Sequence, residues 1–129
     1  MTIREFWRYY FFKVLLIIIV LQLGFFYWME KRNHRPVAVT DEAEVVESRS
    51  VTIPVLKNDT DEDEDDTLSV KQFGDPLYGN ISFNESNYQN AFFLYTPDTG
   101  FAGVDSFWYT ITDDKMKSKK AFVRITVNK

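Results

Sequence analysis

The sequence predicts a mainly β fold: a seven-stranded antiparallel β-sandwich that follows one N-terminal transmembrane helix. Three observations carry this prediction. They are an uncharged apolar run near the N-terminus, alternating apolar and polar residues in the remainder, and turn-forming residues about every 8–15 positions. Aromatic residues make up 17% of the chain, which is too much apolar surface for a disordered protein. The larger part of the chain should therefore form a packed core.

Charge divides the chain into two parts. Residues 1–36 hold six Lys or Arg and two Glu, whereas residues 37–129 hold nine Lys or Arg and seventeen Asp or Glu. Such a split indicates two physical units joined in one chain. The acidic unit would repel phosphate, so we expect no nucleic-acid partner. Cysteine is absent, which excludes disulfides, thiolate nucleophiles and cysteine metal sites.

The apolar run "VLLIIIVLQLGFFYWM" at residues 14–29 carries no charge. Extended back to residue 9 it has 21 residues, enough for a helix that crosses a hydrocarbon core of about 30 Å. Lys13 then lies near the helix end, where its ammonium group can reach the headgroups. We expect a tail at 1–8, a transmembrane signal-anchor helix at 9–29, a basic juxtamembrane linker at 30–36 and the sandwich domain at 37–129.

A cleaved secretory signal is the alternative to an uncleaved anchor. Cleavage requires small residues after the apolar run, but the chain continues with the bulky and charged "FFYWMEKRNHRP". We therefore expect an uncleaved anchor. Three basic residues precede the run and three follow it, so the positive-inside rule barely discriminates between orientations. Signal-anchor topology favours placing the domain outside the cytoplasm.

Alternation predicts strands at 36–41, 50–56, 67–73, 79–83, 91–96, 106–113 and 121–127. Pro54 lacks an N–H group, so the second strand should lie at a sheet edge or be bulged there. The residues expected to face the core are Val51, Ile53, Val55, Leu68, Val70, Ile81, Phe83, Phe93, Tyr95, Phe107, Tyr109, Ile111, Val123, Ile125 and Val127.

Between the second and third predicted strands lies "DTDEDEDD", with seven acidic residues in eight positions from Asp59 to Asp66. The alternate residues Asp59, Asp61, Asp63 and Asp65 would suit a loop that folds around calcium, which binds 6–8 oxygen ligands. An EF-hand is excluded because its glycine, its twelfth-position Glu and its helices are missing. The alternative is a solvated acidic loop that attracts cations weakly and without selectivity.

The segments "VLKNDTD", "YGNISF", "LYTPDTGFAGVDSFWYTITDD" and "AFVRITV" resemble, in this order, the bacterial Ig-like, cadherin-like tandem repeat of surface adhesins. The resemblance covers about residues 35–128. It implies an Ig-like (cadherin-like) β-sandwich without catalysis, commonly stabilised by calcium and used in adhesion or as a spacer. The positions that match the family's calcium-associated residues are Asn58, Asp59, Asp61, Asp63, Asp105 and Asp113. Glu64 stands where the family has Gly, and the loop is one residue longer, so its shape should differ.

Other interpretations remain open for several of these residues. Asp105 and Asp113 could equally hydrogen-bond to the backbone in turns. Trp108 alternates out of phase with the core positions, as do Phe92 and Leu94, so it should face away from the core. An exposed Trp108 is a candidate partner-binding residue, although single exposed aromatic side chains are common.

We expect no enzyme activity, because the sole histidine, His34, has no acid and nucleophile near it in sequence and no phosphate-binding glycine motif occurs. The expected function is a membrane-anchored extracytoplasmic binding or adhesion module, stabilised by calcium, with an unidentified protein or glycan partner. The alternative is a non-catalytic accessory or spacer subunit of a membrane complex, assembled through the transmembrane helix, where Gln22 and Gly24 favour helix contacts. The expected location is the inner (cytoplasmic) membrane, crossed once, with the C-terminal domain in the periplasm or cell exterior.

Overall fold

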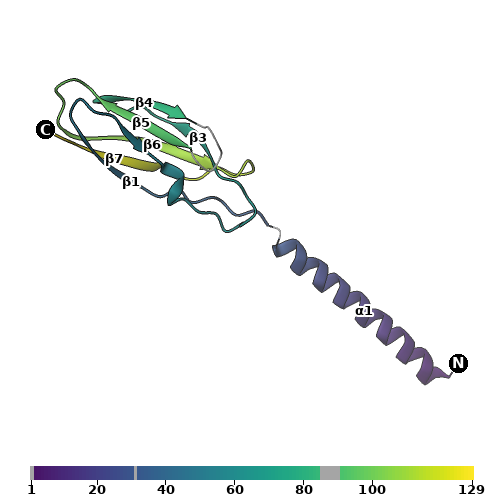
Figure 1. Ribbon diagram of the computed structural model, residues 1–129. Helices are drawn as coiled ribbons and strands as arrows, with labels where there is room; N and C mark the ends of the chain where they lie inside the picture. The colour runs from purple at the N-terminus through teal and green to yellow at the C-terminus, as the bar shows by residue number, and fades with distance from the viewer. Residues whose placement is uncertain (1, 31, 85–90) are drawn as a thin grey trace. The chain divides into compact units, whose positions relative to one another are not determined.

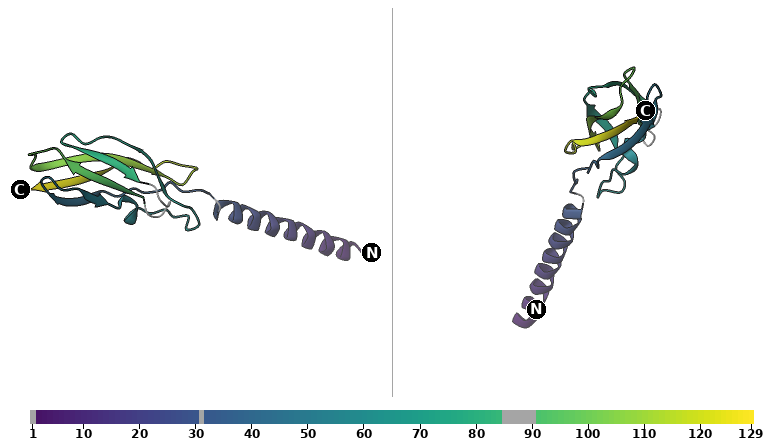
Figure 2. Two further views of the ribbon diagram at one scale, coloured as in Figure 1. Left: turned by 45° about the horizontal axis from the view of Figure 1, so that its top comes forward. Right: turned by 90° about the vertical axis from the view of Figure 1, so that its left-hand side faces the viewer.

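The computed structural model describes every residue except 1, 31 and 85–90. It divides into two compact units, Met1–Arg32 and Asn33–Lys129, which Figures 1 and 2 show from three sides. The first unit is a helix and the second is built from strands.

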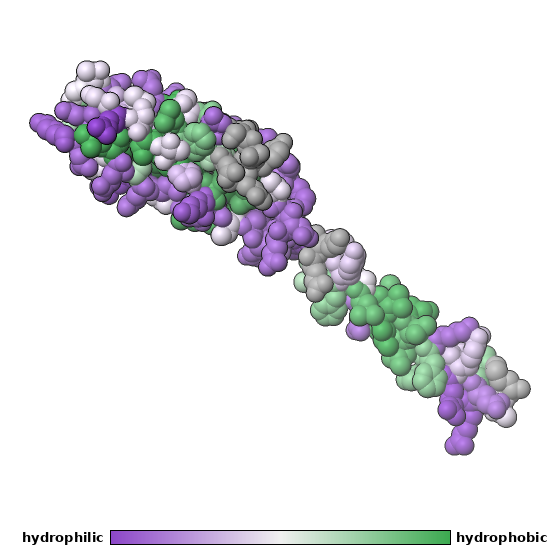
Figure 3. Space-filling model, in the orientation of Figure 1, coloured by the Kyte–Doolittle hydropathy of each residue, from purple (hydrophilic) through white to green (hydrophobic). Residues whose placement is uncertain are grey.

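Helix α1 spans Ile3–Glu30 and has 28 residues. Thr2 and Glu5 form a reciprocal capping box at its N-terminus: the Thr2 N–H donates to Glu5 Oε2 (2.8 Å) and the Glu5 N–H donates to Thr2 Oγ1 (3.4 Å). Residues Ile3–Met29 are long and apolar enough to cross a membrane, and none of this stretch is buried. Figure 3 shows apolar side chains around the middle of the helix and hydrophilic ones gathered near its N-terminal end. The helix thus begins before residue 9, and its first turns carry the charged residues Arg4, Glu5 and Arg8.

The second unit is a sandwich of two sheets. The four-stranded sheet has the order β1-β7-β6-β3 and the three-stranded sheet the order β2-β5-β4. Their bounds are β1 Asp41–Val46, β2 Val51–Ile53, β3 Ser69–Phe73, β4 Gly79–Asn84, β5 Phe92–Pro97, β6 Gly103–Thr112 and β7 Ala121–Asn128, with a short 3-10 helix η1 at Val55–Lys57. Seven strands in two sheets confirm the predicted sandwich.

The prediction of a wholly antiparallel fold is wrong in one pair. Strand β1 runs parallel to β7, from Asp41 opposite Val123 to Val46 opposite Asn128, while every other described pair is antiparallel. The first strand also begins later than predicted. Within 36–41 the backbone of Val37 makes only an isolated bridge to Thr60. Alternation alone could not place this strand, because the inward positions are Asp41, Ala43 and Val45 and the apolar Val46 is exposed, so the apolar residues do not mark one face.

Pro54 ends β2, which is an edge strand of the three-stranded sheet, as a residue without an N–H requires. The core lies between the two sheets. Except for Val45 and Ala121, the buried members of this core are positions predicted by alternation. The most deeply buried large side chains include Phe93, Tyr95, Tyr109, Ile111, Val123 and Ile125. The rings of Phe93 and Phe107 join the two sheets edge to face at 4.9 Å. No disulfide links the sheets, since the chain has no cysteine.

Candidate functional site

The predicted metal-binding residues lie at two different ends of the sandwich. We call the end formed by residues 33–41, 55–66 and 113–118 the linker end, because the chain enters the sandwich there. The far end is formed by residues 46–50, 74–79 and 97–105. At the linker end, the acidic loop is tied to the entering chain by two backbone hydrogen bonds between Val37 and Thr60, of 2.8 and 3.1 Å.

Asp59 is buried at the linker end and is held by two donors. Its Oδ1 accepts from the Val39 N–H (2.7 Å) and from the Tyr109 hydroxyl (3.1 Å). The same hydroxyl lies 2.9 Å from Asp41 Oδ2 and 2.8 Å from the Val39 carbonyl oxygen. One hydroxyl proton therefore faces several acceptors. Burial raises the pKa of both Asp41 and Asp59 to about 6, which favours the protonated form and reduces this excess of acceptors.

Asp61 and Asp63 follow in the same loop. Asp61 Oδ1 accepts from the Asp63 N–H (2.9 Å), while its Oδ2 is buried and has no hydrogen-bond partner. Asp63 accepts from the backbone N–H of His34 (2.6 Å), and its other oxygen lies 3.3 Å from the His34 ring. The backbone hydrogen bond from His34 lowers the pKa of Asp63. The carboxylates thus hold the entering chain against the loop.

Asp113 occupies the turn after β6 and contacts the entering chain as well. It accepts from the backbone N–H groups of Lys115 and Met116, and Asn33 Nδ2 donates to its Oδ2 (2.7 Å). Burial opposes its ionisation, but these hydrogen bonds outweigh burial and lower the pKa of Asp113. Asn33 Oδ1 is buried without a partner. The Lys115 ammonium group pairs with Asp66 at 2.8 Å.

Asn58 and Asp65, the remaining predicted residues of the acidic loop, are both exposed. Asn58 donates to the Thr40 carbonyl oxygen at 3.3 Å. Glu64 stands where the resembling family has glycine, yet positive φ occurs, among described non-glycine residues, only at Ser48 and Asp114. The loop therefore avoids the left-handed turn that a glycine would permit, and Glu64 carries no backbone strain.

Asp105 lies at the far end, away from the other predicted ligands. It precedes Asp113 by eight residues along an extended strand, which corresponds to about 26 Å. Asp105 is 3% exposed, and its carboxylate accepts four hydrogen bonds: from the N–H groups of Leu77 (3.1 Å), Tyr78 (2.9 Å) and Ser106 (2.8 Å), and from the Tyr95 hydroxyl (2.9 Å). Burial, together with Asp105, raises the pKa of Tyr95. Asp105 anchors the turn before β4 and shares no site with the acidic loop.

In the part of the chain that the structure describes, no group of three or more His, Asp or Glu side chains is arranged so that it could hold a metal ion. The two buried oxygens without a partner, Asn33 Oδ1 and Asp61 Oδ2, are nevertheless the kind of atom that a hard cation binds. Both belong to residues at the linker end. Asn33 and Lys115 were not predicted, because nothing in their sequence context marks them as neighbours of the acidic loop.

Trp108 faces away from the core on the outer face of the four-stranded sheet, as its phase predicts. It is half-buried, and the Lys120 ammonium group lies 3.7 Å from the centroid of its ring. Its indole packs closely over Gly74, where a Cβ atom would approach Nε1 to 2.3 Å. Opposite Trp108 in the β6–β7 pair stands Phe122, which is 51% exposed.

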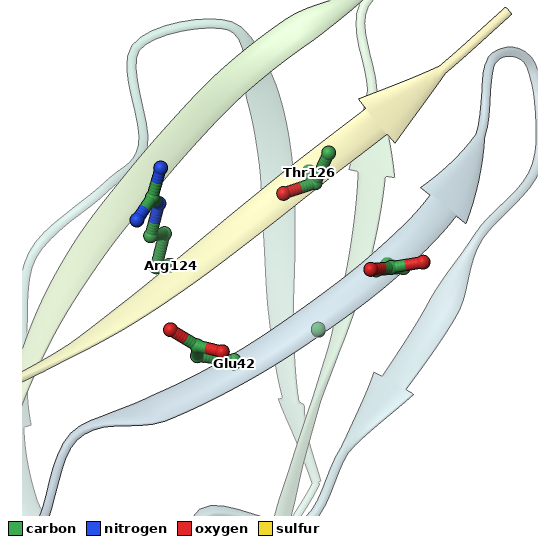
Figure 4. A pocket seen from close by; sticks show the side chains of 5 residues that line it. Glu42, Arg124 and Thr126 are labelled. Carbon is green, nitrogen blue, oxygen red and sulfur yellow. The ribbon is translucent and has the colours of Figure 1, made fainter.

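The same outer face carries a shallow hollow of about 390 Å³ near its β1 edge. It is lined by Glu42, Ala43, Glu44, Arg124 and Thr126, and Figure 4 shows Glu42 and Arg124 on the two neighbouring strands. The lining holds charged and hydroxyl groups but no histidine, so it lacks a base of ordinary pKa near neutrality. The hollow can offer polar contacts to a partner.

Comparison with known proteins finds a matching family and solved structures of similar fold. The profile of the bacterial Ig domain family matches residues 33–126. A nucleoside hydrolase-related hypothetical protein from Saccharophagus degradans, associated with carbohydrate metabolism, shares 19% identity over 74% of this chain and 26% of its own, with a TM-score of 0.50. An endo-fucoidan hydrolase of glycoside hydrolase family 107 shares 18% identity over 73% of this chain and 14% of its own, with a TM-score of 0.51.

No similar sequence was found among curated proteins. The chain spans about a quarter or less of the solved structures it matches, and at these identities the likeness shows the fold alone. The family profile covers most of the chain, from the first residue of the sandwich unit into its last strand. The chain belongs to the bacterial Ig domain family.

Proposed function

We propose that this protein is a non-catalytic, membrane-anchored binding module whose Ig sandwich is displayed outside the cytoplasm. The observation that carries the proposal is α1. Its apolar stretch Ile3–Met29 is entirely unburied, and water would not tolerate so long an exposed apolar surface. Lipid would cover it. The Ig family supports the non-catalytic binding role, since its sandwich is a scaffold for binding surfaces and not for catalysis.

Reporter fusions test the anchor and the side of the membrane. We would fuse alkaline phosphatase, which is active only outside the cytoplasm, or green fluorescent protein, which fluoresces mainly inside it, after Lys129. The proposal expects active phosphatase and dark fluorescent protein in a bacterial host. A chain that lacks residues 1–30 is the matched control, and it should reverse both signals. Fluorescence with an inactive phosphatase in the full chain would contradict the proposed orientation.

We also propose that calcium stabilises the linker end. The support is chemical: Asn33 Oδ1 and Asp61 Oδ2 are buried without partners, and Asp63 and Asp113 contribute carboxylates to the same end. These four residues would hold the ion. Calcium would supply positive charge that joins the entering chain, the acidic loop and the turn after β6.

Thermal unfolding of the full chain in detergent, with calcium or with a chelator, tests this proposal. We expect calcium to raise the melting temperature of the wild type and to leave Asp61→Asn unchanged. Asp65→Asn is the control, because Asp65 is exposed in the same loop. It should keep the full calcium response. A wild type that melts at the same temperature under both conditions at millimolar calcium would rule the site out.

For the binding surface, we propose the outer face of the four-stranded sheet around Trp108 and Phe122. The two side chains stand opposite each other, and Phe122 is 51% exposed, while the polar hollow lies on the same face. Aromatic side chains flanked by polar groups are typical of protein interfaces. Co-purification from membranes with wild type and Phe122→Ser tests this. Equal recovery of the same partner by both would exclude this face.

An accessory subunit assembled through α1 is the second candidate. Gly24 favours it, because nothing lies within 4 Å of the position where a Cβ atom would stand, and small residues of this kind let helices approach closely. Replacing the apolar part of α1 by polyleucine separates the two candidates. If the polyleucine chain still recovers the partner from membranes, the result supports the displayed sandwich. If it inserts correctly but no longer recovers the partner, the result supports assembly through the helix.

A further inference from the structure

The four edge strands of the sandwich differ in how they are protected against pairing with another strand. Natural edge strands are shielded by charges, bulges, proline or short length. Strand β1 carries three acidic side chains. Strand β2 has three residues and is followed by Pro54. Strand β3 carries Lys71 and a break in register between Val70 and Gln72. Each of these three edges therefore has a feature that opposes edge pairing.

Strand β4 has none of these features. Its sequence, GNISFN, contains no charge and no proline, its six residues pair with β5 in unbroken register, and none of the described strands covers its other side. Figure 1 shows β4 at the border of its sheet. Among the described edges, β4 alone is long, regular and uncharged.

The hydrogen-bond phase of β4 identifies the backbone groups that point away from β5. The Asp98 N–H donates to the Tyr78 carbonyl oxygen (2.9 Å), so this pair, in register with the β4–β5 ladder, is a hydrogen-bonded one. Hydrogen-bonded and non-bonded pairs alternate in an antiparallel ladder. The N–H and C=O groups of Gly79, Ile81 and Phe83 therefore point to the open edge.

The side chains along this edge are apolar and incompletely covered. Ile81 and Phe83 face the core side of β4 but are only half-buried. Phe73, on the neighbouring edge strand β3, is 40% exposed, and its ring lies 5.6 Å from that of Phe83. The strands β3 and β4 thus leave an apolar seam open between the two sheets. A further strand beside β4 would cover it.

We propose that β4 pairs antiparallel with β4 of a second copy of this chain, about a two-fold axis at Ile81. In this register Gly79 stands opposite Phe83 of the second copy, so the phenylalanine side chain meets no competing side chain. Ile81 faces Ile81 of the second copy. On the outer face, Asn80 stands opposite Ser82 of the second copy, and both can hydrogen-bond. The backbone N–H and C=O groups of Gly79, Ile81 and Phe83, which point to the open edge, all find partners in the second copy, which gives about six new backbone hydrogen bonds.

Self-complementarity is the reason to name a second copy as the partner. A two-fold contact needs one surface patch that fits itself, and the glycine and phenylalanine of β4 are placed symmetrically about Ile81. Charge agrees with this choice. Residues 37–129 hold seventeen acidic and nine basic residues, so most surfaces of two copies repel each other, but β4 brings no like charges together. Added salt should therefore strengthen the dimer, since it screens the remaining repulsion.

Disulfide trapping tests the register. Because the chain has no native cysteine, every disulfide must form between the introduced cysteines. Two differently tagged full chains, Asn80→Cys and Ser82→Cys, are co-expressed, and the membranes are treated with a mild oxidant. In the proposed register the two cysteines form a non-hydrogen-bonded pair with Cα atoms about 4.5 Å apart, within disulfide range. We expect the mixed disulfide to exceed either self-pair several-fold. Thr52→Cys, exposed on the opposite edge strand, is the control and should give no cross-link above background.

Charge substitution tests whether this contact drives association. The full chain in detergent is followed by sedimentation, and we expect a dimer whose dissociation constant rises at least tenfold in Asn80→Lys/Ser82→Lys. Both side chains are exposed, so the melting temperature should stay near that of the wild type. Thr52→Lys is the matched control and should leave the dimer intact. A monomeric wild type at about 100 µM, or a dimer that survives the double lysine substitution without the mixed disulfide, would overturn the proposal.

Discussion

Replacing Asp105 by Asn tests whether this residue is a structural anchor of the far end. The change keeps the shape of the side chain but removes its charge and turns one oxygen into an NH₂ group. Each carboxylate oxygen accepts two hydrogen bonds, so the amide must face two donors. In the least costly orientation the Tyr95 hydroxyl turns to accept, and the Tyr78 N–H loses its partner.

The magnitude follows from these contacts. A hydrogen bond to a charged group contributes about 1.5–3 kcal/mol, and the remaining bonds weaken when the charge is lost. We expect the free energy of unfolding to fall by about 2–4 kcal/mol. For a sandwich of this size that corresponds to a melting temperature lower by about 8 °C or more.

The assay is unfolding of the full chain in detergent, followed by tryptophan fluorescence, with calcium and with a chelator. Asp75→Asn is the matched control, since Asp75 is exposed in the loop before β4 and should change stability little. We expect the loss in Asp105→Asn to be the same under both conditions. A loss below about 1 kcal/mol would refute the anchor role, and a loss seen only with calcium would make Asp105 a calcium ligand.

Three further predictions concern the sandwich. Phe107→Ala should lower the free energy of unfolding by about 3–5 kcal/mol in a thermal melt, since the ring is 2% exposed, and an unchanged melt would contradict its place in the core. Gly79→Ala should lower the free energy of unfolding by about 1–3 kcal/mol, because its Cβ would lie 2.6 Å from the Tyr95 ring. Urea unfolding measures this loss, and an unchanged free energy of unfolding would contradict the prediction. Burial raises the pKa of Asp59 to about 6, so the protonated side chain stabilises the fold. With chelator present, the free energy of unfolding of the wild type, relative to that of Asp59→Asn, should be highest below about pH 4 and should fall by about 1–2 kcal/mol as the pH rises through 6. A difference that grows over this interval would show the opposite sign.

Much of the fold could be predicted because alternate side chains of a strand point to opposite faces, so an alternating pattern tells which residues face the core. Phe93, Tyr95, Phe107 and Tyr109 are buried where their phase requires. The direction of β1 could not be predicted, since parallel and antiparallel strands have the same period of two.

The candidate site was less predictable. Aspartates that look close in sequence are separated by an extended strand, as with Asp105 and Asp113. Conversely, Asn33 and Asp113 are 80 positions apart but share a hydrogen bond of 2.7 Å. Spacing along a chain reports proximity only within one element, so the contacts between the entering chain and the acidic loop needed the tertiary fold.

Protease accessibility in spheroplasts tests whether an uncleaved α1 displays the sandwich outside the cytoplasm. The full chain carries one epitope before Met1 and another after Lys129. We expect a single membrane-bound species with both epitopes, from which external protease removes the C-terminal epitope and leaves the N-terminal one protected with α1. A C-terminal epitope that is protected until the membrane is opened would contradict the proposed orientation, and a chain that has already lost its N-terminal epitope before protease is added would contradict the uncleaved anchor.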